Sequence, residues 1–231
     1  MNPPFRRIAG EAWAFRSRVE HEAARRFRRL SATISGFDAD SPVPALLMKA
    51  AEDEVRHAAL CAELAEGYGE TATDRAEEKD IVPASLDERA GALYEMVAAC
   101  CITETESVAT LATLLAEQAE PRVGSVLREI ARDEVAHGRM GWAHLAREAE
   151  RTDVAFLSPF IPSMLSGTAA HGLFTAADAE LESPELLRHG VLPHSTKREI
   201  FIGTLEGVVL PGLEKFGIHT GPARAWLEER R

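Results

Sequence analysis

The stretch Asp53-Glu54-Val55-Arg56-His57 returns later in the chain as Asp133-Glu134-Val135-Ala136-His137. Each copy contains Glu-x-x-His inside a segment whose apolar residues recur at the spacing of a helix. Side chains three positions apart on a helix project from the same side, so each copy can offer a carboxylate and an imidazole to one point in space. The repeat therefore predicts two helices that each bring one Glu–His pair to a common polar site.

The composition is that of an ordinary globular chain with an acidic balance. Its 231 residues are 45% apolar and 27% charged, and the net charge is −11. This length indicates one domain, or one domain with an appendage. The negative charge argues against a nucleic-acid or anionic-membrane partner. No run approaches the roughly 18 apolar residues that a membrane-spanning helix needs, so no such helix is expected.

The cysteines and the first residues of the chain point to the cytoplasm. Cys61, Cys100 and Cys101 show no CxxC spacing, and a reducing compartment is the simplest explanation for such cysteines. Residues 1–15 contain no unbroken apolar stretch of signal-peptide length. We therefore expect a cytoplasmic protein.

Local start and stop signals predict four long helices. Ser41-Pro42 is an N-cap followed by proline at the first helical position, and Ser85-Leu86-Asp87-Glu88 has the pattern of a capping box. Gly36 and Gly67 are stop signals near the ends of the first two helices. The predicted helices cover about residues 6–35, 41–68, 85–119 and 121–151.

The lengths of the connections predict the topology. The first and second helices are joined by a short link, as are the third and fourth, and short links force antiparallel neighbours. The link from Gly69 to Ala84 is about 16 residues and could reach roughly 50 Å, which is enough to travel the length of a bundle. We therefore expect an all-α four-helix bundle with one long crossover, from the second helix to the third.

The last third of the chain has a different character. Prolines divide residues 152–231 into short pieces, with one helix expected from Ser195 to about Phe216, interrupted at Pro211-Gly212, and a last short helix after Pro222. We interpret residues 1–151 as the bundle and residues 152–231 as a helical C-terminal extension packed on it.

The first and third helices each offer two glutamates at the depth of the Glu–His pairs. Glu20 or Glu22 lies opposite Glu54, and Glu104 or Glu106 lies opposite Glu134, because equal distances from the turn of an antiparallel hairpin mean equal height. The helical period of about 100° per residue decides between the candidates. Glu20 and Glu104 share the apolar faces of their helices, whereas Glu22 and Glu106 are expected to point away.

Charge balance then predicts a metal site. An ionised carboxylate buried without a partner costs several kcal/mol, and four such groups at one level would be hard to tolerate. Two divalent cations supply four positive charges, and neutral imidazoles complete their coordination. The expected ligands of this dinuclear site are Glu20, Glu54, His57, Glu104, Glu134 and His137.

A second set of polar residues accompanies these ligands. Asp53 and Asp133 each precede a ligand glutamate. We hypothesise that each aspartate accepts the outward N–H of a metal-bound histidine, in its own pair or in the other pair, and that Arg56 holds one of the aspartates.

The pattern Glu20…Glu54-x-x-His57…Glu104…Glu134-x-x-His137 resembles the ferritin-like di-iron carboxylate superfamily, which contains rubrerythrins, bacterioferritins and the small subunits of ribonucleotide reductase. The stretches 20–27 and 132–145 are more similar still to uncharacterised bacterial ferritin-like domain proteins. The resemblance covers about residues 10–150. It implies a ferritin-like fold, the six ligands above, and two iron ions, with manganese or a mixed manganese–iron pair as variants.

The resemblance implies three kinds of function. The first is an oxidoreductase, that is an oxidase, hydroxylase or peroxidase, which takes dioxygen or peroxide, an unidentified small substrate and an electron donor. The second is a ferroxidase or another iron-handling protein, and the third is a non-catalytic helical scaffold. A rubrerythrin with a rubredoxin iron site is disfavoured, because the chain lacks CxxC pairs. Each of these three functions is compatible with an oligomeric protein.

Overall fold

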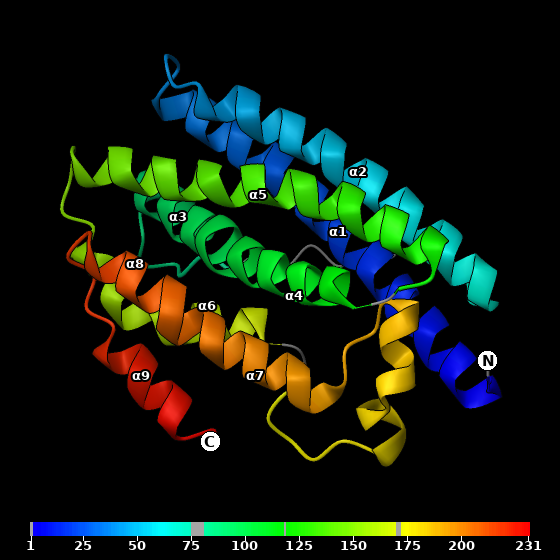
Figure 1. The fold of residues 1–231 in the computed structure, drawn as a ribbon. Helices are drawn as coiled ribbons and strands as arrows, with labels where there is room; N and C mark the ends of the chain where they lie inside the picture. The colour runs from blue at the N-terminus through cyan, green and yellow to red at the C-terminus, as the bar shows by residue number, and fades with distance from the viewer. Residues whose placement is uncertain (1, 75–80, 118, 170–171) are drawn as a thin grey trace.

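The computed structural model describes residues 2–74, 81–117, 119–169 and 172–231. Every regular element in these ranges is helical. The long helices are α1 (Pro3–Phe37), α2 (Val43–Tyr68) and α5 (Pro121–Ala149), together with a third helix made of three consecutive segments, α3 (Glu88–Met96), η1 (Val97–Thr103) and α4 (Glu104–Ala116) (Figure 1).

The predicted bundle topology is confirmed. α1 and α2 form an antiparallel hairpin, α4 packs against α5, and α2 contacts α5 across the bundle. Gly69 ends α2 in a left-handed conformation, with φ 94°. Glycine adopts this conformation without a steric cost. This topology brings the middles of α1, α2, α5 and the segmented third helix to one level.

The start of the third helix differs from the expectation. The carboxylate of Asp87 accepts a hydrogen bond from the backbone N–H of Ala90 at 2.8 Å, so Asp87 is the N-cap. Ser85, the expected cap, lies before the helix. Asp87 can replace it because aspartate and serine satisfy the free N–H groups of a first turn in the same way.

The third helix is also not the continuous α-helix that the sequence predicts. η1 is a π-helical segment, in which the N–H of Glu104 bonds to the carbonyl of Ala99, five residues earlier. A wider turn of this kind changes the rotational phase of everything that follows it, and such segments are frequent at functional sites. Here the π-helical segment ends at Glu104, one of the expected ligands.

The C-terminal extension consists of shorter helices: η2 (Ala155–Phe160), α6 (Ile161–Thr168), η3 (Ala179–Glu182), η4 (Pro184–His189), α7 (His194–Thr204), η5 (Leu205–Val209), α8 (Leu210–Glu214) and α9 (Gly221–Glu228). The irregularity that the sequence places at Pro211-Gly212 lies earlier, in the π-helical segment η5. The proline ring would crowd the carbonyl four residues before it, and a widened turn relieves that contact.

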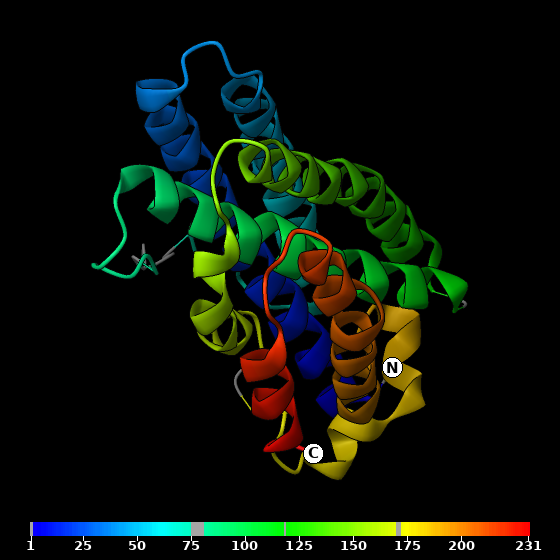
Figure 2. The same ribbon diagram turned by 90° about the vertical axis from the view of Figure 1, so that its left-hand side faces the viewer.

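The extension packs on the side of the bundle formed by the third helix. α6 contacts η1, α7 contacts α4, and η5 contacts η1 (Figure 2). One apolar cluster joins Val97 of η1 and Leu145 of α5 with Leu157, Phe201 and Leu205 of the extension. The division of the chain at residue 151 stays a prediction.

The third helix requires one correction concerning membranes. The stretch Glu88–Ala116 is long and apolar enough to cross a membrane by length and composition, contrary to the expectation from apolar runs. Half of its apolar window is buried inside the protein, and it carries the buried Glu95 and Glu104. Its position is that of the central helix of the bundle, whose apolar character follows from burial on several sides.

Candidate metal centre

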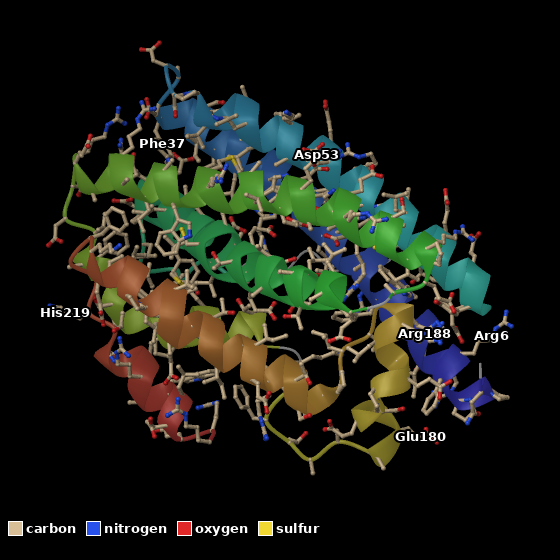
Figure 3. All side chains as sticks on the ribbon, in the orientation of Figure 1. Arg6, Phe37, Asp53, Glu180, Arg188 and His219 are labelled. Atoms are coloured by element: carbon tan, nitrogen blue, oxygen red, sulfur yellow. The ribbon has the colours of Figure 1, made fainter. Side chains whose placement is uncertain are left out.

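The structure brings the six predicted ligands together. Glu20 comes from α1, Glu54 and His57 from α2, Glu104 from the first turn of α4, and Glu134 and His137 from α5. Glu20 is partly buried and the other five are buried. Figure 3 labels Asp53, the neighbour of Glu54, about midway along α2. Four helices therefore converge on one polar point inside an apolar bundle.

The six residues form two overlapping groups of four. Glu20, Glu54, His57 and Glu134 make one group, and Glu54, Glu104, Glu134 and His137 make the other. Within each group the candidate ligand atoms all lie within 4.8 Å of one another. Both groups contain Glu54 and Glu134, which we call the shared carboxylates. Each group adds one glutamate and one histidine of its own, so the two halves of the centre are alike.

Both imidazoles turn the same nitrogen toward the shared carboxylates. Nδ1 of His57 lies 3.1 Å from Oε2 of Glu54 and 3.6 Å from Oε1 of Glu134. Nδ1 of His137 lies 3.0 Å from Oε1 of Glu54 and 3.0 Å from Oε2 of Glu134. Nδ1 is therefore the inward nitrogen of each histidine, and Nε2 faces outward.

The outward nitrogens face the two aspartates across the bundle. Nε2 of His57 on α2 lies 3.2 Å from Oδ2 of Asp133 on α5. Nε2 of His137 on α5 lies 3.6 Å from Oδ2 of Asp53 on α2. Arg56 contacts both aspartates, at 2.9 Å from Oδ1 of Asp53 and 2.6 Å from Oδ2 of Asp133. Each aspartate thus faces the histidine of the other pair, and one arginine lies between them.

The carboxyl groups of the centre have unequal proton affinities. Burial, together with the negative charge of neighbouring carboxylates, raises the pKa of Glu20 and of Glu104 well above the usual range. Burial acts in the same direction on Glu134, but hydrogen bonds from His137 and His57 outweigh it and lower its pKa to about 2. Without metal, the centre therefore favours protons on Glu20 and Glu104 and an ionised Glu134.

The imidazoles take the complementary state. Burial lowers the pKa of each histidine, but hydrogen bonds to Glu134 and Glu54 outweigh it, raising the pKa of His57 to about 11 and that of His137 to about 10. Two imidazolium groups then face the two shared carboxylates. In the metal-free centre, protons on the imidazoles rather than metal cations thus oppose the negative charge of the carboxylates.

The donor atoms fit a pair of divalent cations. Oε1 of Glu54 is buried and, although it lies 3.0 Å from Nδ1 of His137, has no hydrogen-bond partner among the described residues. A buried acceptor without a donor is costly, and a cation would satisfy it. Carboxylate oxygens and imidazole nitrogens are the donors that divalent iron and manganese accept. The residues present therefore suit two such ions, with the shared carboxylates between them.

Metal binding is expected to release more than two protons per chain at pH 7: one from each imidazole, and the rest from Glu20 and Glu104, whose pKa is raised above the usual range. Because metal competes with protons whose pKa values lie above 7 at both histidines, the apparent affinity should rise with pH between 6 and 8. Calorimetric titration with Mn(II) in two buffers of different ionisation enthalpy measures the proton count. Release of two protons or fewer would show that Glu20 and Glu104 are already ionised in the metal-free protein.

The surroundings of the centre include two residues that the sequence pattern did not identify as buried neighbours of the ligands. Glu106, expected to point away, is partly buried, and burial raises its pKa. The helical period could not show this, since α7 covers that part of α4. Arg16 was passed over, although its spacing of four residues from Glu20 puts both on one face of α1. That spacing was the signal that could have identified it.

Comparisons with known proteins bear on the family and the fold. The rubrerythrin family model matches residues 14–144, which is more than half of the chain and a range that contains all six candidate ligands. One similar solved structure is described as Protein 19 with aldehyde deformylating oxidase activity from Synechococcus. It aligns with a TM-score of 0.60 over 99% of this chain and 100% of that chain, at 17% sequence identity. At this identity the likeness shows a common fold, and it extends over the C-terminal extension. The comparison with curated proteins gives no match.

Proposed function

The chain belongs to the rubrerythrin family, and we propose that it is a dinuclear non-haem iron oxidoreductase that uses dioxygen or peroxide to oxidise a small substrate. The observation that carries this proposal is the pair of four-residue groups joined by Glu54 and Glu134. Two adjacent sites with shared carboxylates suit two metal ions that act together. The oxidase activity named for the similar Synechococcus protein supports an oxygen-dependent reaction.

Each candidate ligand has a distinct task in this proposal. Glu54 and Glu134 would help to hold both ions, because each belongs to both groups. Glu20 with His57, and Glu104 with His137, would complete one ion each. When bound, iron supplies the electrons and the open coordination positions that reaction with dioxygen or peroxide requires. A manganese or mixed manganese–iron pair would use the same donors.

The surrounding residues would hold this arrangement in place. Asp133 and Asp53 would each accept the Nε2–H of the opposite histidine, which fixes the tautomer with a free Nδ1 and raises the basicity of the ligand nitrogen. Arg56 would keep both aspartates oriented. The ring of Phe27 meets His137 edge-on, with centroids 5.8 Å apart, and helps to exclude water from one side.

The proposed reaction also needs an electron donor and a suitable cellular compartment. The sequence contains no CxxC pair for a second iron site, so the proposed enzyme takes its electrons from a separate donor. The three free, buried cysteines suit a reducing cytoplasm, which we propose as its location.

The proposal is tested by loading the protein anaerobically with Fe(II), measuring bound iron by mass spectrometry, and then admitting dioxygen. We expect about two iron ions per chain and oxygen consumption that repeats when a chemical reductant is supplied. Iron uptake that continues far beyond this ratio, in a very large oligomer on size-exclusion chromatography, would instead indicate a ferroxidase or storage protein. A chain that takes up neither Fe(II) nor Mn(II) would be a helical scaffold.

A further inference from the structure

Arg16 is a cation beside the metal centre for which the described residues supply no ion-pair partner. It lies on α1 one turn before Glu20, and its guanidinium stacks over the ring of Trp13 at 4.7 Å. Its Nη1 atom is buried and has no hydrogen-bond partner, and no ion pair with Arg16 is found within the described ranges. Arg16 as a whole is partly buried, but a guanidinium nitrogen withdrawn from water in this way is costly unless an anion or acceptor meets it. The position therefore indicates a ligand rather than a structural ion pair.

A second cation, from the C-terminal extension, approaches the same place. Lys197 lies on α7, which packs along α4 (Figure 1). Ile200, one turn further on, packs against the apolar cluster that contains Trp13. Burial and the positive charge of Arg16 both lower the pKa of Lys197, as expected for two cations that are close together. Lys197 likewise has no ion pair in the part of the chain that the structure describes.

The carboxylates nearby do not neutralise this pair. Glu106 on α4 interacts with the charges of both cations, but its Oε1 accepts a hydrogen bond from Thr110 at 2.9 Å, and it forms no ion pair with Arg16 or Lys197. Glu20 is assigned to the metal centre. Two basic side chains thus face Glu106, whose own pKa burial raises, so an added monoanion would be attracted to the pair.

The two halves of the metal centre differ at this position. One turn before Glu20 stands Arg16, whereas one turn before Glu104 stands the neutral Cys100, which is buried against Gly141. Because the corresponding position in the second half of the centre has a neutral side chain, a cation at this position is not required for holding metal. This asymmetry indicates that Arg16 and Lys197 serve something that binds beside one half only.

We propose that Arg16 and Lys197 form a carboxylate-binding subsite between α1, α4 and α7, which holds the acid group of the substrate beside Glu20. The planar guanidinium fork matches a carboxylate, and Glu106 would repel the second charge of a dianion such as phosphate. One turn of α1, about 5–6 Å, separates Arg16 from Glu20. A small carboxylic acid held here would carry its reacting carbon a few bonds from the acid group. The assignment to substrate rests on the proposed function.

The test is calorimetric titration of the metal-loaded full chain with acetate, propionate and butyrate, at constant ionic strength with chloride as the balancing anion. We expect one saturable site for carboxylates. Arg16→Gln and Lys197→Gln should each weaken binding at least tenfold, since each removes a charge-assisted contact. Arg198→Gln is the matched control, because it removes the same charge from the adjacent position of α7 and should leave binding unchanged.

Several outcomes would overturn the subsite. The proposal is wrong if carboxylates bind no more tightly than chloride. It is also wrong if Arg198→Gln weakens carboxylate binding as much as Lys197→Gln does. Binding retained in both Arg16→Gln and Lys197→Gln would place the carboxylate on the metal instead. Thermal melts check the fold of each variant, and Arg16→Lys, which keeps the charge, should retain part of the binding if Arg16→Gln unfolds.

The binding readout is independent of turnover. If the protein binds carboxylates through Arg16 but never reacts with oxygen, the subsite is supported and the proposed function is wrong. If it consumes oxygen but does not bind carboxylates, the proposed function is supported and the subsite is wrong.

Discussion

Replacing Glu54 or Glu134 with glutamine is expected to empty both metal positions, from about two ions per chain to none. Replacing Glu20 or Glu104 in the same way should leave one ion. The reason is that both four-residue groups contain the two shared carboxylates, whereas Glu20 and Glu104 each belong to one group. Loss of a shared carboxylate removes one negative charge and one donor from both positions at once.

Equilibrium dialysis against Mn(II) or Fe(II) under anaerobic conditions, followed by metal analysis, measures this difference. Glutamine keeps the size of each side chain, so the comparison isolates charge and donor strength from packing. Equal loss of metal in all four variants would show that the two positions cannot be emptied separately. One residual ion in Glu54→Gln or Glu134→Gln would show that the replaced glutamate does not hold both ions.

The aspartate variants supply a graded control. Asp53→Asn and Asp133→Asn leave all six candidate ligands in place, so the ratio of about two ions per chain should persist at saturation. The affinity should fall by roughly 10- to 100-fold, as is usual when the partner of a metal-bound histidine is lost. Unchanged affinity in both variants would mean that the aspartates do not orient the histidines.

The site could be predicted from sequence as far as its chemistry depends on local spacing. Glu-x-x-His within one helix needs only the helical repeat, and the depth of Glu20 and Glu104 follows from short turns between antiparallel neighbours. The pairing of Asp133 with His57, and of Asp53 with His137, was left open. It depends on the axial register of α2 against α5, which no single helix encodes.

Other features depend on contacts between distant parts of the chain. The π-helical η1 leaves no mark in the apolar pattern, since it is a change in backbone hydrogen bonding over seven residues. The burial of Glu106 and the approach of Lys197 to Arg16 follow from the packing of α7 on α4. A sequence pattern that describes each helix separately cannot show which face a later helix covers.

Gly141→Ala is expected to destabilise the protein by about 2–3 kcal/mol, the cost of overpacking a well-filled interior. A Cβ at this position of α5 would lie 2.3 Å from the Cβ of Cys100, 3.0 Å from its carbonyl carbon and 3.2 Å from its Cα. Most of these atoms are backbone, and Cys100 lies within η1, so a rotamer change cannot relieve the clash. α5 or η1 must move.

Gly138→Ala on the same helix is the matched control. A Cβ there would meet the carbonyl oxygen of Cys100 at 3.7 Å and the Cβ of Glu104 at 3.8 Å, which is ordinary contact. Alanine in the middle of a helix is favoured over glycine by roughly 0.5–1 kcal/mol. The two substitutions add the same methyl group one turn apart, and they should shift the free energy of unfolding in opposite directions.

Urea denaturation of the metal-free variants measures that free energy, and metal titration measures the effect on the centre. Because η1 runs directly into Glu104, a displaced η1 in Gly141→Ala should weaken the half of the centre formed by Glu104 and His137 first, leaving the Glu20–His57 half occupied. Equal stability of Gly141→Ala and Gly138→Ala would show that η1 yields to the added methyl group at little cost. The close approach of η1 to α5 would then not be what sets the position of Glu104.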